Sequence, residues 1–378
     1  MEFGNYSKTW SLVETSKNNN EFNMKYIAVI MNFSFLSLCY SQEIPDVPPA
    51  LGDYAIIKIS PKVIDENGAP IKDAEVHVAV GDPLEYKDGY NDFRGRSDEQ
   101  GLFVVESKIQ TNIVIEVKKF GYYSSRLIYI SPQNQMLHNI KSGDKIQPWN
   151  PTIPIILKKI GKPIPMIVRL GLSNSERIYR APRLGEEVGF DIIKADWVQP
   201  NGKGEIADLL IRFESEFLSP ESYKTDATIR FANPDDGLLP ITELIGEESE
   251  LKYPRLAPEN GYEVKSLNVK SPIYEARSEA KEKQPLGYLF RIRTDRDEVT
   301  NKITSAQYGK IVGRQGAQEN TNPFQFNTLN RNEKRELVLE PSFTFSSYLN
   351  PTPNDQNLEY DQQNNLAPDA DIGVTLPP

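Results

Sequence analysis

The sequence predicts an all-β fold in which two β-rich domains follow one another. Its 378 residues include 28 prolines and 23 glycines, which favours many short strands joined by turns over a helical bundle. Several short segments alternate apolar and polar residues, as half-buried strands do. Helical periodicity is weak, and residues 241–251 and 278–284 are the only candidates for short helices. The length is sufficient for two or three domains, each with its own core.

Residues 1–41 are predicted to be an N-terminal extension followed by a signal peptide. Lys25 supplies a positive charge, and residues 26–38 form a mostly apolar run of signal-peptide length. Small residues before Gln42 favour cleavage there. The run is shorter than the about 20 apolar residues that a membrane span requires, so no transmembrane segment is expected after cleavage.

Two alternatives concern this N-terminal region. Residues 1–23 are polar and rich in asparagine, which makes Met24 a candidate for the true start. Lipid attachment at Cys39 is the alternative to cleavage, and Leu38 before it is larger than lipidation favours. Cys39 is the single cysteine, so no internal disulfide or cysteine-rich metal site is expected. Residues 42–52 are predicted to be a linker.

Residues 53–160 are predicted to form a seven-stranded β-sandwich. The turns between its strands contain Gly68, Gly101 and Gly121 as backbone-geometry positions and Asp98 as a turn-capping side chain. About seven short strands with such turns between them are typical of a sandwich. The strand-like runs lie at residues 54–65, 74–80, 101–106, 112–118, 126–130 and 153–157.

Three separated segments of this domain carry a family resemblance. They are DENGAPIKDAEV at residues 65–76, SDEQGLF at 97–103 and VKKFGY at 117–122, in that order. Together they resemble the carboxypeptidase regulatory-like domain, a transthyretin-like sandwich appended to many exported proteins. The resemblance implies the fold and a non-catalytic accessory role, and some relatives with this type of fold bind carbohydrate. Residues 81–95 form a longer loop than the motif requires.

Aromatic residues near this loop are the candidate ligand-binding residues. Tyr86, Tyr90 and Phe93 stand among acidic and amide side chains, and Trp149 lies in a turn-like segment. Aromatic rings beside carboxylates suit sugar recognition, because the ring stacks on the sugar while the acids accept its hydroxyls. The alternative is that these rings cover the end of the sandwich or the seam between domains.

Residues 161–349 are predicted to form a second β-rich domain, a sandwich or a jelly-roll-like fold. Strand signals recur through it, and Trp197 at the end of one strand is either a stacking platform or half-buried. Several phrases resemble an uncharacterised family of exported bacterial proteins and imply one architecture without a known activity. These phrases lie at residues 164–166, 188–191, 196–198, 202–204, 308–311 and 348–355.

Residues 350–378 are predicted to be an acidic disordered tail. No lysine or arginine follows Arg335, while acidic residues continue to Asp371. The formal net charge of the whole chain is −10 at pH 7, and no basic stripe is present. These features argue against nucleic-acid binding, which needs clustered cations.

No catalytic machinery or cofactor is predicted from the sequence. No nucleophile elbow, phosphate-binding loop, zinc-protease motif or dinucleotide fingerprint is present. The two histidines, His77 and His138, are far apart in sequence, which argues against a metal site. Two pairs of aspartates, the second followed by Glu298, could supply paired carboxylates for a glycosidase. Arg291, Arg293 and Arg296 nearby favour salt-bridged surface charge instead. These pairs are Asp191 with Asp196 and Asp295 with Asp297.

The predicted function is therefore that of an exported, non-catalytic accessory or surface protein. Adhesion, envelope structure and protein–protein interaction are the expected roles, in the periplasm, at the cell surface or outside the cell. A carbohydrate-binding module is the alternative. The expected partner is accordingly a glycan or an envelope protein.

Overall fold

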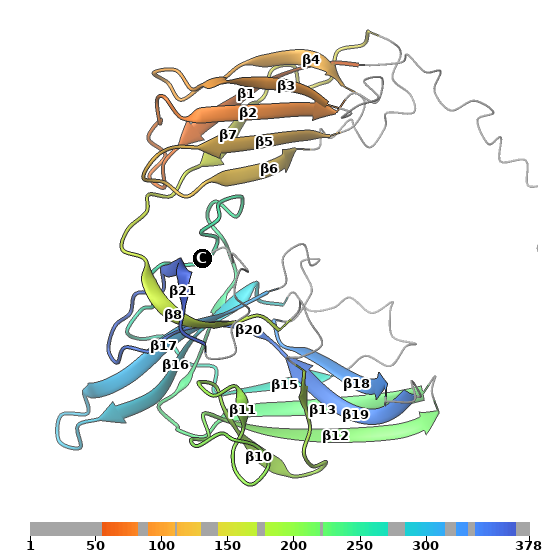
Figure 1. Cartoon of the computed structure of the whole chain (residues 1–378), viewed down its shortest axis with the longest axis vertical. Coiled ribbons are helices and arrows are strands. Elements are labelled where there is room, and N and C mark those ends of the chain that lie inside the picture. Colours follow the sequence, from red (N-terminus) through yellow and green to blue (C-terminus); the bar gives the residue numbers. More distant parts are fainter. Residues whose placement is uncertain are drawn as a thin grey trace, which may run out of the picture. The chain divides into compact units, whose positions relative to one another are not determined.

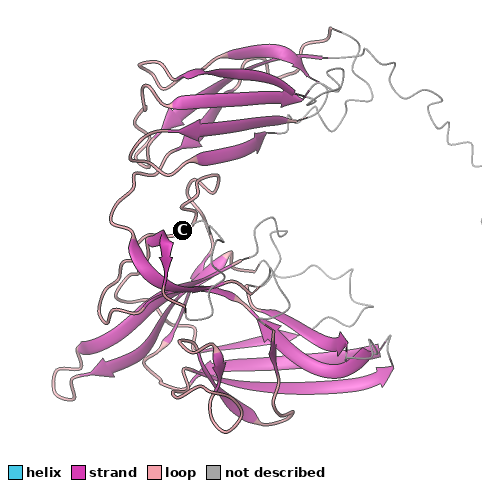
Figure 2. Cartoon of the chain, viewed as in Figure 1, coloured by secondary structure: helices cyan, strands magenta, loops and turns pink. Residues whose placement is uncertain are grey.

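The all-β prediction is confirmed, because the described part of the chain contains strands and no helix (Figure 2). Residues 241–251, a predicted helix, form the end of a strand and a turn instead. No described helix could therefore cross a membrane. The computed structural model describes residues 55–81, 90–109, 112–129, 143–171, 178–219, 222–270, 284–313, 323–331 and 337–367, all within one compact unit, Pro49–Pro378.

The first seven strands form a sandwich of two sheets around one apolar core (Figure 1). One sheet has the order β4-β1-β7 and the other has the order β3-β2-β5-β6. The predicted seven-stranded sandwich is therefore present, but residues 90–95, which were expected to belong to a loop, lie in its third strand. Its strands are β1 (Ala55–Ile64), β2 (Glu75–Gly81), β3 (Tyr90–Arg96), β4 (Val105–Ile109), β5 (Ile113–Lys118), β6 (Ser125–Tyr129) and β7 (Thr152–Ile156).

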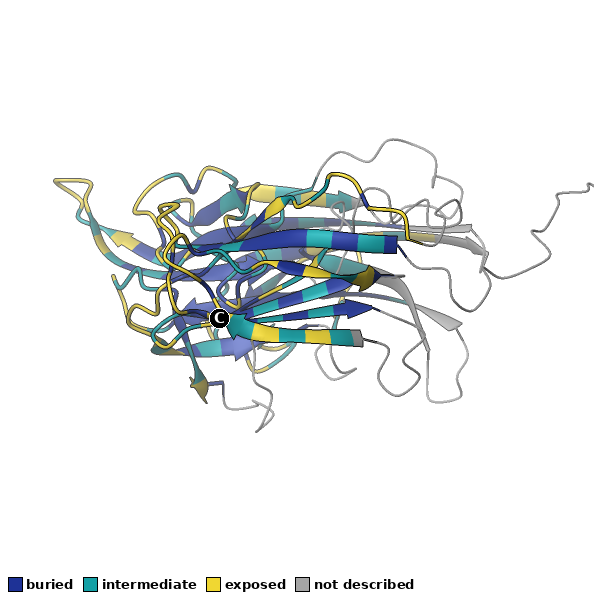
Figure 3. Ribbon diagram, turned by 90° about the horizontal axis from the view of Figure 1, so that it is seen from above, coloured by how far each residue is buried: buried dark blue, intermediate teal, exposed yellow. Residues whose placement is uncertain are grey.

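Strict alternation along β2 and β5 separates the two faces of the four-stranded sheet. Val76, Val78 and Val80 are buried, while Glu75 and His77, which alternate with them, face outward. Strand β5 repeats the pattern, and Figure 3 shows buried and exposed residues alternating along strands. Because successive side chains of a strand point to opposite faces, the sheet has one apolar and one charged face.

The turns of this sandwich use the residues that the sequence indicated. Gly68, Gly101 and Gly121 all have positive φ angles, and a Cβ on Gly101 would lie 2.3 Å from the carbonyl oxygen of Val63. Asp98 Oδ1 accepts hydrogen bonds from the backbone N–H groups of residues 100 and 102 at 2.9 and 2.8 Å. These roles are confirmed.

The remaining strands form sheets with two further apolar cores. The larger core contains a cluster of aromatic rings around Phe343, and Trp197 packs edge-on against Phe190 at 5.5 Å. Trp197 is therefore a core residue and not a stacking platform. The sheets have the orders β11-β10-β12-β13-β15, β14-β16-β17-β20-β8-β21 and β18-β19-β9. Their strands are β8 (Ile164–Arg169), β9 (Tyr179–Arg180), β10 (Glu187–Asp191), β11 (Asp196–Trp197), β12 (Leu209–Ser219), β13 (Ser222–Phe231), β14 (Gly237–Ile241), β15 (Ser266–Lys270), β16 (Gly287–Arg296), β17 (Ile303–Val312), β18 (Gln325–Arg331), β19 (Leu337–Thr344), β20 (Ser346–Asn350) and β21 (Tyr360–Asn365).

The predicted disordered tail is wrong for residues 350–367. Leu358 and Tyr360 are fully buried, and β21 pairs in parallel with β8. Asn365 also exchanges side-chain hydrogen bonds with the backbone N–H and carbonyl of Val168 at 3.0 and 2.9 Å. The lack of cations suggested disorder, but two apolar side chains and backbone-binding amides are sufficient to order the segment. Residues 368–378 lie outside the described part.

Glu359 ties this C-terminal segment to the connection between the sandwich and β8. Its carboxylate accepts hydrogen bonds from the Tyr123 hydroxyl at 2.9 Å and from the N–H groups of Gly161 and Lys162 at 2.7 and 2.8 Å. Burial, together with the hydrogen bond to Glu359, raises the pKa of Tyr123 above its ordinary value. The tyrosine therefore stays a hydrogen-bond donor throughout the physiological range.

Lys310 on β17 is a lysine with no solvent exposure. Its Nζ atom donates a hydrogen bond to the Leu358 carbonyl at 3.0 Å and lies 5.2 Å from the centre of the Tyr348 ring. Burial lowers the pKa of Lys310 to about 7, the charge of Lys158 adds to the shift, and Glu359 opposes it. The amine is thus largely uncharged at alkaline pH.

Candidate functional site

The candidate site is the outer face of the sheet β3-β2-β5-β6, which we call the charged face. The antiparallel register places ionic side chains of neighbouring strands opposite each other in rows, where they can interact directly. The first row is Arg96, Glu75 and Lys118, and the second is Arg94, His77, Glu116 and Arg126, with Asp92 beside it.

Each carboxylate on the charged face already has a partner. Glu75 pairs with Arg96 and Glu116 pairs with Arg126, both at 3.0 Å. Asp92 lies 2.8 Å from the Nε2 atom of His77. These pairs are largely exposed, and such pairs each contribute only about 0 to 1 kcal/mol to stability. Because of these pairs, none of the three carboxylates is available to the remaining cations of the face.

Two cations, Arg94 and Lys118, are in surplus on this face. Neither forms an ion pair with any residue that the structure describes. Both are exposed, and both line an open hollow of about 480 Å³ together with Arg96 and His77. Of the three carboxylates on this face, Asp92 pairs with His77, so its four arginine and lysine side chains share only two carboxylates in a chain whose overall net charge is −10.

Gly95 separates the two outward-facing arginines of β3. It lies between Arg94 and Arg96 and faces inward, where the Phe103 ring occupies the space of a side chain. A Cβ on Gly95 would lie 2.5 Å from a carbon of that ring. Because successive side chains of a strand point to opposite faces, both flanking arginines point outward to the hollow.

Two further hollows border the first one. The second has a volume of about 770 Å³ and shares Glu75, Arg96 and Lys118 with it. The third has a volume of about 420 Å³ and shares Glu116 and Lys118. Lys118 lines all three hollows, so it occupies the centre of the charged surface.

Of the predicted sugar-binding aromatic residues, the structure describes the side chains of Phe93 and Trp149. Phe93 packs against the sandwich core, because it alternates with the outward residues 92 and 94. Trp149 is half-buried beside Lys145, whose Nζ atom lies 4.8 Å from the ring centre, and lines none of the three hollows. Tyr86 lies outside the described residues, as does the side chain of Tyr90, the first residue of β3.

Arg94 and Lys118 were not identified as site residues from the sequence. The signal was present, because residues 92, 94 and 96 alternate with inward positions, as do residues 116 and 118. The surplus of cations becomes visible only when the strand register pairs the other charges.

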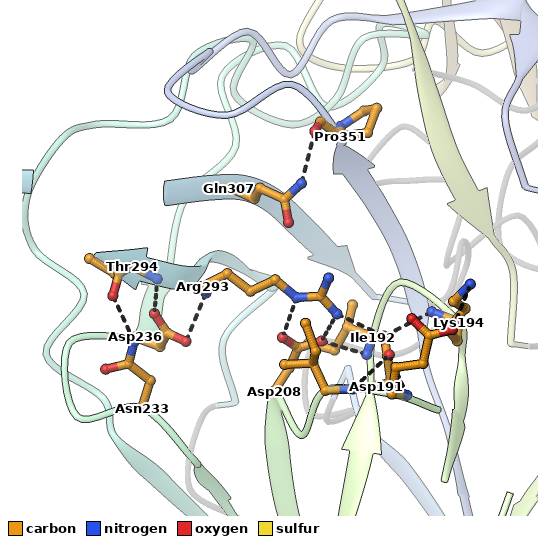
Figure 4. Close-up of polar contacts among 12 residues, drawn as sticks. Asp191, Ile192, Lys194, Asp208, Asn233, Asp236, Arg293, Thr294, Gln307 and Pro351 are labelled. Atoms are coloured by element: carbon orange, nitrogen blue, oxygen red, sulfur yellow. Dashed lines mark hydrogen bonds and ion pairs between the residues drawn. The ribbon is translucent and has the colours of Figure 1, made fainter. Parts of the chain in front are cut away.

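The part of the chain that follows the first sandwich contains another group of charged residues, which lies in its interior (Figure 4). Arg293 donates from Nε to Asp208 Oδ1 and from Nη2 to Asp191 Oδ1, both at 2.9 Å. Both aspartates are buried, so the expectation of a surface salt bridge is wrong for Arg293. We call these three residues the buried triad.

The two aspartates of the buried triad differ in their pKa values. Burial raises the pKa of Asp208 although Arg293 opposes the shift. Burial also acts on Asp191, but N–H groups of residues 194, 205 and 206 and the charge of Arg293 lower its pKa overall. All three groups are satisfied by one another and by backbone, which is typical of a structural network.

Asp191 and Asp196 are cross-strand partners in β10 and β11, but their carboxylates bind different groups. Asp191 binds Arg293, whereas Asp196 accepts hydrogen bonds from the N–H groups of Trp197 and Lys203. Asp297 caps a turn by accepting from the N–H groups of residues 299 and 300. Within the described ranges, no group of three or more histidine, cysteine, aspartate or glutamate side chains is placed to hold a metal ion.

Comparison with known proteins gives little similarity. No family model and no curated protein matches the chain, so the resemblance to the carboxypeptidase regulatory-like domain stays a prediction. Solved structures that share part of the fold include 3-chlorocatechol 1,2-dioxygenase from Rhodococcus opacus 1CP, with 18% identity and a TM-score of 0.23 over 29% of this chain and 60% of that chain. The dioxygenase domain of a fusion protein from Streptomyces sp. SirexAA-E has 11% identity and a TM-score of 0.22 over 30% and 86%. The chain spans 53% to 60% of the length of the first three dioxygenases it matches.

The predicted function is contradicted by this comparison. The sequence suggested an adhesion, envelope or protein-interaction role, with carbohydrate binding as the alternative. The solved structures that match part of the chain are instead catechol and hydroxyquinol dioxygenases. The likeness covers a minor part of the chain at TM-scores near 0.2, so it transfers no activity to this protein.

Proposed function

We propose that the protein binds an anionic ligand on the charged face, between Arg94 and Lys118. The observation that carries the proposal is the surplus of these two cations over an open hollow in which every carboxylate is already paired. A small organic or inorganic anion provides the acceptors that both side chains lack.

The chemistry of the two cations favours a ligand with several acceptor oxygens. A guanidinium group can donate two parallel hydrogen bonds to a carboxylate or phosphate, and an ammonium group adds a point charge. Arg96 is held by Glu75 at the edge of the same hollow, where its remaining donors extend the site. We therefore expect phosphates and polycarboxylates to bind more tightly than monovalent anions.

Export is proposed separately, from the signal-like segment alone. That segment and Cys39 lie outside the described residues. The anion-binding proposal does not depend on where the protein resides.

Replacing Arg94 and Lys118 together with glutamine is expected to weaken anion binding about tenfold. Each exposed contact contributes roughly 0.7 kcal/mol, and two such contacts amount to about one power of ten in the dissociation constant. The measurement is isothermal titration of the purified chain with inorganic phosphate and with citrate at low ionic strength. Both side chains are exposed, so the fold is expected to be unchanged.

The matched control replaces two other exposed cations, Lys203 and Lys302, with glutamine. This control changes the net charge equally and leaves the charged face intact. Equal weakening in both double variants would mean that only overall charge matters, and the site would be rejected. Absence of binding of either anion to the unaltered chain would reject it as well.

A further inference from the structure

Phe120 is wholly exposed at the turn between β5 and β6. Its relative exposure is 104%, the highest among the exposed large hydrophobic side chains of the described residues. A hydrogen bond from the Tyr122 N–H to the Lys119 carbonyl at 3.0 Å closes the turn, and Gly121 has a φ of 80°. The turn therefore holds the ring outward in a defined backbone conformation.

Ile160 provides a second exposed apolar side chain next to this turn. Its N–H donates to the Gly121 carbonyl at 2.9 Å, and Lys159 forms a β-bridge with Tyr122. The two segments therefore run side by side, although about 40 residues of sequence separate them. Phe120 and Ile160 belong to one local surface.

Lysines surround the two apolar side chains. Lys159 and Lys162 are exposed, and Lys119 is half-buried with its Nζ atom donating to the Lys72 carbonyl at 2.6 Å. Neither residues 117–122 nor residues 158–163 contain an acidic residue. Lys119 and Phe120 also line the second hollow, whose wall contains Asp73, Glu75 and Glu250. The Glu359 carboxylate beneath residues 161 and 162 accepts hydrogen bonds from their N–H groups. We call Lys119, Phe120, Lys159, Ile160 and Lys162 the lysine–phenylalanine patch.

We propose that the lysine–phenylalanine patch docks onto an anionic lipid surface. An exposed aromatic ring and an aliphatic side chain can enter the boundary between head groups and acyl chains, while lysines around them attract the lipid phosphates and carboxylates. Charge complementarity selects this occupant, because the patch is locally basic in a chain of net charge −10. The inference does not require Arg94 or Lys118 and stands apart from the proposed anion site.

The turn between β16 and β17 also exposes an apolar side chain, but with acidic residues beside it. Val299, at the turn between β16 and β17, is 92% exposed and follows Asp297 and Glu298. It is an apolar side chain of nearly equal exposure with acidic neighbours, which an anionic surface repels. Val299 therefore provides the matched control.

The test is sedimentation of the purified chain with vesicles of phosphatidylcholine, with and without phosphatidylserine. The unaltered chain is expected to bind the phosphatidylserine vesicles and to be released by salt. Phe120→Ser is expected to lower the vesicle affinity about tenfold, since the ring no longer enters the interface. The triple change of Lys119, Lys159 and Lys162 to glutamine is expected to lower it at least as much and to reduce its dependence on salt. Val299→Ser should bind as the unaltered chain does.

Several results would overturn the inference. These are no binding to phosphatidylserine vesicles, equal binding by the Phe120→Ser variant, or equal losses from Phe120→Ser and Val299→Ser. Binding to soluble polyglutamate that is as tight as vesicle binding and indifferent to Phe120 would assign the patch to acidic polymers instead. The variant lacking Arg94 and Lys118 should keep its vesicle binding, so failure of one proposal is distinguishable from failure of the other.

Discussion

Replacing Lys310 with methionine is expected to stabilise the protein, by roughly 3 to 5 kcal/mol at neutral and acidic pH. Burial lowers the pKa of Lys310 from 10.5 to about 7, so the folded state disfavours the charged amine. Methionine has a similar length and no charge. It gives up the hydrogen bond to the Leu358 carbonyl, which is worth about 1 kcal/mol.

The gain in stability from Lys310→Met is expected to depend on pH. Between about pH 7 and pH 10.5 the unfolded chain binds a proton at Lys310 that the folded chain lacks, so the stability of the unaltered protein falls as pH decreases through this window. Below about pH 7 both states are protonated and the penalty is constant. The advantage of the methionine variant should therefore be smallest near pH 10.5 and reach its full value below pH 7.

Urea unfolding of both proteins at several pH values measures the difference. Lys302→Met, at an exposed position, is the control and should change stability little at any pH. A Lys310→Met variant that is less stable at every pH would show that the hydrogen bond to Leu358 outweighs the cost of burying the charge.

Replacing Arg293 with methionine is expected to destabilise the protein by about 3 to 5 kcal/mol, because it leaves two buried carboxylates without their cation. The largest effect is expected at Asp208, because burial raises the pKa of its carboxyl group even with Arg293 in place. Without the guanidinium group its pKa should rise further. The folded variant then binds a proton that the unfolded chain lacks, so the loss of stability should shrink as pH falls toward about 4.

A second substitution distinguishes the loss of charge pairing from simple loss of packing. Asp208→Asn in the Arg293→Met background removes the unpaired carboxylate while keeping its shape. Partial recovery of the unfolding free energy, measured by urea unfolding at neutral pH, is the expected result. No recovery would mean that the side-chain stem of Arg293, and not its charge, supports the buried triad.

The first sandwich was predictable because its signals are local. Alternation along Glu75–Gly81 identified a strand with one apolar face, and the turn residues Asp98 and Gly101 lie between two strands that are consecutive in sequence. Each of these features needs only a few consecutive residues. The charged face follows from the same alternation, but the surplus of Arg94 and Lys118 depends on cross-strand register, which local patterns do not define.

The buried triad and the last strand could not be predicted in this way. Arg293 lies 85 residues from Asp208 and 102 from Asp191, so no local pattern connects them. Strand β21 has a polar composition that suggested disorder, and it is ordered by pairing with β8, whose Val168 is 197 residues before Asn365. Long-range pairing supplied the stability that composition alone did not indicate.

The position of β8 between β20 and β21 has a consequence for synthesis on the ribosome. All seven strands of the first sandwich lie within residues 55–156, so it can close early. Strand β8 emerges next, but both of its neighbours begin only at residue 346 or later. Until then its two edges are unpaired, and bare strand edges invite association with other chains. This interval of translation is expected to be the one in which the nascent protein depends most on chaperones.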